Sequence, residues 1–116
     1  MIALLPQDTI VFTTANGESI YAQANCINNN GSIEPFSEIA TIAGDYTLIP
    51  ADGSPAKPQR RLASMSFHNL ASNPTETVLV KREDSAASVD IFLIGPVSLA
   101  GGQTLWYESG HGWSIV

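Results

Sequence analysis

The sequence has little cysteine and little charge. Cys26 is the single cysteine among 116 residues, so the chain cannot form an internal disulfide, and a disulfide-stapled secreted scaffold is excluded. Charged residues make up 14% of the chain, below the roughly 25% of ordinary soluble domains, whereas hydrophobic residues make up 44%. A surface with so few charges is easily desolvated, which is consistent either with lasting contact with a partner or with a plain low-charge monomer.

Positive charge is especially scarce. Five Lys and Arg residues stand against eleven Asp and Glu, the net charge is −6, and the adjacent basic pairs are Arg60-Arg61 and Lys81-Arg82. Because phosphate contacts supply most of the affinity for nucleic acids, we expect no DNA or RNA binding, and an anionic membrane surface is disfavoured for the same reason. No apolar run approaches the ~20 residues of a membrane span. The segment Met1–Asp8 lacks the basic start of a signal peptide, so we expect synthesis and residence in a cytoplasm-like compartment.

Catalytic and metal-binding patterns are also missing. The two histidines and the cysteine show no metal-ligand spacing, and we interpret His68 as a strand residue that is solvated or hydrogen-bonded across strands. Ser54-Pro-Ala-Lys57 matches a Ser-x-x-Lys pattern, but that chemistry needs a helix and the prolines favour a loop. Glu83, Asp84 and Asp90 are expected to be turn or strand-end charges. The sequence therefore predicts no catalytic residue, no cofactor and no metal site.

The C-terminal half instead contains short runs whose side chains alternate with period 2. The first three runs have Asn, Asp, Gly or Pro at or just after their ends, which is typical of a half-buried antiparallel sheet. Val78 and Val80 are predicted to point inward, and Ala63, Met65 and Phe67 form the apolar face of the first run. The runs are Leu62–Asn69, Thr77–Arg82, Val89–Ile94, Thr104–Glu108 and Trp113–Val116.

The N-terminal part begins with an apolar arm, residues 1–7, which is either an ordinary edge strand or a segment that joins a neighbour's sheet. Two β-rich runs follow, Thr9–Thr14 and Ser19–Ala24, joined by Asn16-Gly17. Asn-Gly suits a type I′ turn, whose central residues need positive φ, so the pattern predicts a hairpin.

Residues 25–59 are interpreted as loop-rich. Short strands are expected at Ile39–Ala43 and Tyr46–Ile49, and Glu34–Ala40 is a candidate for one helical turn. We therefore predict an all-β protein in which residues 1–116 form one domain, with the core antiparallel strands in 60–116. The architecture expected is a single antiparallel β-sandwich or small barrel, jelly-roll or immunoglobulin-like, with an N-terminal arm and irregular loops.

For two of the predicted strands, the sequence leaves open what covers each face. Val89–Ile94 is apolar on both faces apart from Asp90, which predicts a central strand or one covered by a neighbouring subunit. In Thr104–Glu108, Leu105 and Tyr107 share one face and Trp106 takes the other, toward a second layer or a partner. Trp106, Tyr107 and Trp113 are either core aromatics or a platform that stacks on sugars.

The motifs of the C-terminal half resemble those of small β-sandwich structural proteins from tailed-bacteriophage virions. The resemblance covers about Arg60–Val116. It is carried by a Ser-x-x-x-x-Asn strand, a strand with Thr and Val, an apolar strand, a Leu-x-x-Gly-x-x-Leu-x-Tyr segment and a closing Gly-x-Gly-Trp. In this chain these are Ser64–Asn69, Glu76–Val80, Val89–Leu93, Leu99–Tyr107 and Gly110–Trp113.

The resemblance implies a virion structural protein without cofactor or reaction. The expected function is that of a capsid cement (decoration) protein on the head surface, a homotrimer that stabilises the head by binding neighbouring major capsid protein subunits. The alternatives are a tail, baseplate or fibre adaptor component, or a carbohydrate-binding β-sandwich module. The partner-binding residues expected are Ile2, Leu4, Leu5 and Trp106.

Overall fold

Ten β-strands and no α-helix make up the described part of the chain. The structure, a computed structural model, describes residues 2–52, 60–84 and 89–116. Met1, the Ser54–Lys57 pattern and residues 85–88 lie outside these residues. The expectation of an all-β protein is confirmed.

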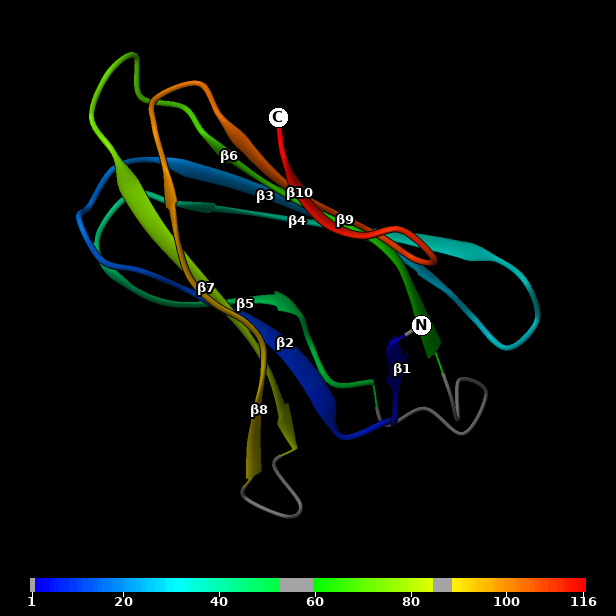
Figure 1. The fold of residues 1–116 in the computed structure, drawn as a ribbon. Helices are drawn as coiled ribbons and strands as arrows, with labels where there is room; N and C mark the ends of the chain where they lie inside the picture. The colour runs from blue at the N-terminus through cyan, green and yellow to red at the C-terminus, as the bar shows by residue number, and fades with distance from the viewer. Residues whose placement is uncertain (1, 53–59, 85–88) are drawn as a thin grey trace.

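The strands form two antiparallel sheets that pack face to face as a β-sandwich (Figure 1). One sheet has six strands in the order β10-β9-β6-β3-β4, and β1 pairs with β6 beyond the end of β9. Its strands are β1 (Ile2–Leu4), β3 (Ile20–Ile27), β4 (Ile33–Ala40), β6 (Arg60–Asn69), β9 (Thr104–Glu108) and β10 (Gly112–Ile115). The other sheet has the order β5-β2-β7-β8. Its strands are β2 (Asp8–Thr14), β5 (Gly44–Ile49), β7 (Glu76–Asp84) and β8 (Val89–Leu99).

The core fills the space between the two sheets. The ring of Phe12 on β2 lies 5.4 Å from the ring of Phe67 on β6, so the two layers meet directly at this contact. Phe12 also stacks on Tyr46 of its own sheet at 5.4 Å. Val78 and Val80 have no exposed surface, as the alternation predicted.

The five strands predicted in the C-terminal half are all present, but strands that follow one another along the chain are often in different sheets. β6 lies in the six-stranded sheet and β7 in the four-stranded sheet, whereas β7 and β8 pair with each other. The chain changes sheet again between β8 and β9. The period-2 alternation of side chains therefore predicts where these strands lie but not which strands pair.

The hairpin predicted at Asn16-Gly17 is wrong, because the strands on either side belong to different sheets. β2 already pairs with β5 and β7, and β3 with β4 and β6. Gly17 does adopt a positive φ of 80°. The turn crosses between the sheets and is held by the carboxylate of Glu76, which accepts hydrogen bonds from the backbone N–H groups of Ala15, Asn16 and Glu18 at 2.9, 2.7 and 2.9 Å.

Residues 25–59 contain more strand than predicted. β4 occupies the segment expected to be a loop or a helical turn, and it pairs with β3 along its whole length. β5 begins at Gly44, in the other sheet. Pro35 has no N–H to donate, which restricts it to an edge strand, and β4 is the edge of its sheet.

β8 is an edge strand and not the central strand predicted from its apolar faces. Its pairing with β7 shifts register twice, once across Gly95-Pro96, where proline again removes a donor, and once at Leu93. Ile91 and Phe92 are 41% and 65% exposed. Cover by a neighbouring subunit, the other interpretation of this strand, stays a prediction.

Candidate functional site

The four residues predicted to bind a partner lie in three different environments. Leu4 has no exposed surface and is part of the core of its own chain. Ile2 is half-buried against that core, on the short strand β1 that pairs with β6. Leu5 is 45% exposed and Trp106 is 38% exposed.

The apolar arm is therefore an edge strand of its own sheet. Leu4 is wrong as a partner-binding residue, because it has no surface to offer, and the guanidinium of Arg82 fixes the arm further by donating to the carbonyl of Ala3 at 3.3 Å. Leu5 and Trp106 keep enough exposed surface for a partner. Leu5 follows β1, whose last residue pairs with Arg60 of β6, whereas Trp106 pairs with Ser66, six positions further along β6, so the two do not form one site.

The three C-terminal aromatics lie on two different faces of the sheet, as the alternation of β9 predicted. Tyr107 is 6% exposed, its ring lies 5.0 Å from that of Trp113, and burial raises the pKa of its phenol. Both rings pack on the core side of the sheet. Trp106 points to the outer face, so a sugar platform made of all three aromatics is excluded.

The cross-strand neighbours of Trp106 are both serines. Ser66 of β6 lies on one side and Ser114 of β10 on the other. Directly paired residues share a face of the sheet, and a serine is too short to cover an indole. The indole is therefore left exposed by its neighbours.

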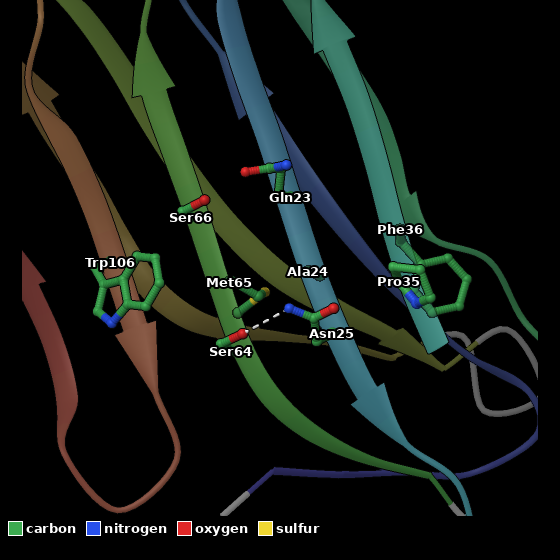
Figure 2. Close-up of a pocket in the computed structure, with 9 residues that line it drawn as sticks. All are labelled: Gln23, Ala24, Asn25, Pro35, Phe36, Ser64, Met65, Ser66 and Trp106. Carbon is green, nitrogen blue, oxygen red and sulfur yellow. Dashed lines mark hydrogen bonds between the residues drawn. The ribbon is translucent and has the colours of Figure 1, made fainter. Parts of the chain in front are cut away.

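A shallow hollow of about 120 Å³ opens next to this tryptophan on the outer face (Figure 2). Its polar lining comes from neighbouring strands: Gln23 and Asn25 on β3, Ser64 and Ser66 on β6. Enzyme and cofactor pockets usually measure about 300–1,000 Å³, so this hollow can hold only one part of a larger ligand.

The side chains of the hollow are neutral and partly held by hydrogen bonds. The amide nitrogen of Asn25 donates to the hydroxyl of Ser64 at 3.2 Å, and that of Gln23 donates to the hydroxyl of Tyr21 at 3.2 Å. Each amide keeps its carbonyl oxygen and a second N–H for a ligand. None of the described residues lining the hollow is ionisable, so it offers no general acid or base.

The ionisable residues discussed in the sequence analysis contact neighbouring side chains of the fold. His68 Nδ1 lies 2.8 Å from the hydroxyl of Thr104 on the next strand, which confirms the cross-strand interpretation. Glu83 and Asp90 both contact Lys81, at 3.1 and 3.5 Å. Within the described ranges no group of three or more His, Cys, Asp or Glu could hold a metal ion.

Cys26 is a core residue. It has no exposed surface, and burial raises the pKa of its thiol to about 11. A thiol reacts as the thiolate, so this cysteine is a poor nucleophile in the folded chain.

A second surface feature is a set of apolar side chains at the sheet edges. Ile91 and Phe92 lie on edge strand β8, and Leu5 lies near the same end of the four-stranded sheet, where Asp8 pairs with Asp84 and Asp84 with Val89. The remaining exposed large apolar residues on or next to edge strands are Ile33, Ile39, Ile42, Ile115 and Val116.

The motif residues of the C-terminal half serve the fold. Asn69 is fully buried, and its amide donates to the carbonyls of Pro74 and Leu99, both at 2.9 Å. Gly102 takes a positive φ of 84° in the turn before β9, and Gly110 and Gly112 take 86° and 76° in the turn before β10. These residues shape the turns on either side of β9, the strand that carries Trp106.

Comparisons of the chain with protein-family models, with curated proteins and with solved structures give no match. The search for a helix long and apolar enough to cross a membrane finds none among the described residues.

Proposed function

We propose that this protein is a structural component of a tailed-bacteriophage virion, of the capsid cement type. It acts without catalysis, as a homotrimer on the head surface, and stabilises the head by binding neighbouring subunits of the major capsid protein.

The observation that carries the proposal is the exposed apolar edge of the four-stranded sheet. β8 is unpaired on its outer side within the described chain, and it presents Ile91 and Phe92 to solvent. An unpaired strand offers backbone N–H and C=O groups to another chain, and monomeric proteins usually protect such edges with charge. Asp90 is the one charged residue of β8, and Gly95-Pro96 interrupts only the later part of the strand, so the edge beside Ile91 and Phe92 has little protection.

The charge of the chain supports the same proposal. A net charge of −6 disfavours contact with packaged nucleic acid, so the protein suits the outside of a head. The small hollow and its neutral lining give no support to an enzymatic alternative.

The first experiment is a copy-number measurement on purified particles by quantitative mass spectrometry. A cement protein is expected at a copy number comparable with that of the major capsid protein. A few copies per particle would instead identify a tail, baseplate or fibre component, and absence of the chain from particles would refute both.

The second experiment asks whether β8 makes the contact. Phe92→Ser should reduce attachment to particles lacking the protein, because it removes the largest exposed apolar side chain of the edge. Leu70→Ser is the matched control: Leu70 is 52% exposed but lies in the loop after β6. Equal attachment of the two variants would show that β8 is not the contact.

A further inference from the structure

We propose that the hollow beside Trp106 is a binding site for a neutral glycan, with the indole stacking on one sugar ring. The site lies on the six-stranded sheet, on a different surface from the β8 edge to which capsid attachment is assigned, and so adds a second activity to the proposed function.

The first step of the argument is the exposed indole. The CH groups on one face of a sugar ring are apolar and pack well on a flat aromatic surface. Trp106 supplies such a surface because its cross-strand neighbours, Ser66 and Ser114, are too short to cover it. A tryptophan placed only for stability would instead be expected inside, as its neighbour Tyr107 is.

The second step is the set of polar groups beside the indole. Gln23, Ser66 and Trp106 lie side by side on three adjacent strands, which spans roughly 10 Å at about 4.8 Å per strand. Amide and hydroxyl groups both donate and accept, as sugar hydroxyls do. The indole N–H and the Ser66 hydroxyl have no hydrogen-bond partner within the described chain, so both are available to a ligand.

The third step is preorganisation. The bond from Asn25 to Ser64 and the bond from Gln23 to Tyr21 hold the two amides on rigid strands before any ligand arrives. Fixing polar groups in advance reduces the entropy lost on binding.

The lack of charged side chains in the hollow indicates which class of ligand it can bind. The residues lining the hollow are all neutral, and Glu108, which pairs with Ser64, lies at its border. With a net charge of −6 on the chain, an acidic sugar would be repelled, and a phosphate or peptide carboxylate would find no cation. The small volume restricts the contact to one or two rings of a longer chain.

The test is an NMR titration of the full ¹⁵N-labelled chain with chitotriose, cellotriose and maltotriose, and with acidic sialyllactose. The side-chain signals of Gln23, Asn25 and the Trp106 indole N–H report directly on the hollow. We expect at least one neutral trisaccharide to shift them saturably, with a Kd of about 1 mM or tighter, and sialyllactose to bind more weakly.

Trp106→Ala should weaken that binding by at least about tenfold, whereas Trp106→Phe should retain most of it, because a ring remains. Phe92→Ala is the matched control, since it removes an exposed aromatic from the other sheet and should leave sugar binding unchanged. Urea unfolding of each variant checks that the fold is kept.

Three results would overturn the proposal: no shift with any neutral sugar, equal binding by the folded Trp106→Ala variant, or preference for the acidic sugar. Loss of particle attachment in Trp106→Ala without sugar binding by the parent chain would also overturn it, and would assign this face to a protein partner. Capsid attachment is tested separately by Phe92→Ser, so one proposal can fail while the other stands.

Discussion

Replacing Glu76 with glutamine tests how this sandwich is held together where the chain changes sheet. Glu76 has no exposed surface, and its carboxylate accepts four backbone hydrogen bonds. One oxygen accepts from Ala15, Asn16 and Thr77, and the other accepts from Glu18. Glutamine keeps one acceptor oxygen and places an NH₂ group against the remaining N–H.

The expected cost follows from these bonds. Hydrogen bonds to a charged group each contribute about 1.5–3 kcal/mol and neutral ones about 1 kcal/mol, so losing one bond and the charge on the other three should cost at least about 3 kcal/mol. For a chain of this size that lowers Tm by roughly 10 °C. The measurement is urea unfolding followed by tryptophan fluorescence.

The cost should depend on pH. Burial raises the pKa of Glu76, but the hydrogen bonds from the N–H groups of Asn16, Thr77, Ala15 and Glu18 outweigh it, so the pKa lies below its ordinary value. A lowered folded-state pKa means that the stabilisation is fully present above the unfolded-state pKa of about 4.3 and is lost as the pH falls through the folded-state pKa. The parent chain and Glu76→Gln should therefore converge in stability at low pH.

Glu108→Gln is the matched control, because it removes a carboxylate from an exposed position on β9 and should change stability by less than about 0.5 kcal/mol. A Glu76→Gln penalty no larger than that of this control would refute the reasoning. A penalty that stays constant from neutral to acid pH would do the same.

Three further substitutions or reactions test the packing. Gly101→Ala should destabilise the fold by about 1–3 kcal/mol, because a Cβ there would lie 2.6 Å from the backbone of residues 71–73, whereas Gly95→Ala meets nothing within 4 Å and should be nearly neutral; urea unfolding compares them. Leu4→Ala should cost about 2–5 kcal/mol in the same assay, and a neutral result would show that the arm is not part of the core. Cys26 should resist iodoacetamide at pH 8 in the native chain and react once urea unfolds it, as mass spectrometry would show; rapid native labelling would contradict its burial.

Two prolines indicate which strands lie at the edges of their sheets. Pro35 lies in the segment expected to be loop-rich, yet a proline is compatible with an edge strand, and β4 is one. Gly95-Pro96 follows directly on the run Val89–Ile94 and marks β8 as an edge in the same way. Each proline indicates an edge strand only once it is known that its segment continues as a strand.

Part of the candidate site could be predicted from the sequence. Alternation along Thr104–Glu108 placed Trp106 opposite Leu105 and Tyr107, and the structure agrees. Nothing in the sequence indicated that Gln23 would lie on the same face, since it is more than eighty positions away and reaches the hollow only through β6.

The sequence by itself determined the strands of the C-terminal half and their apolar sides, because both follow from local period-2 alternation and from turn residues. It did not determine β4, which lies in a segment expected to be a loop or a helical turn. The tertiary structure alone decided which strands pair, that Asn16-Gly17 crosses between sheets, and that β8 is left at an edge. The physical reason is that any strand can offer its backbone hydrogen bonds to any other, so the choice of partner depends on how all the apolar faces are buried at once.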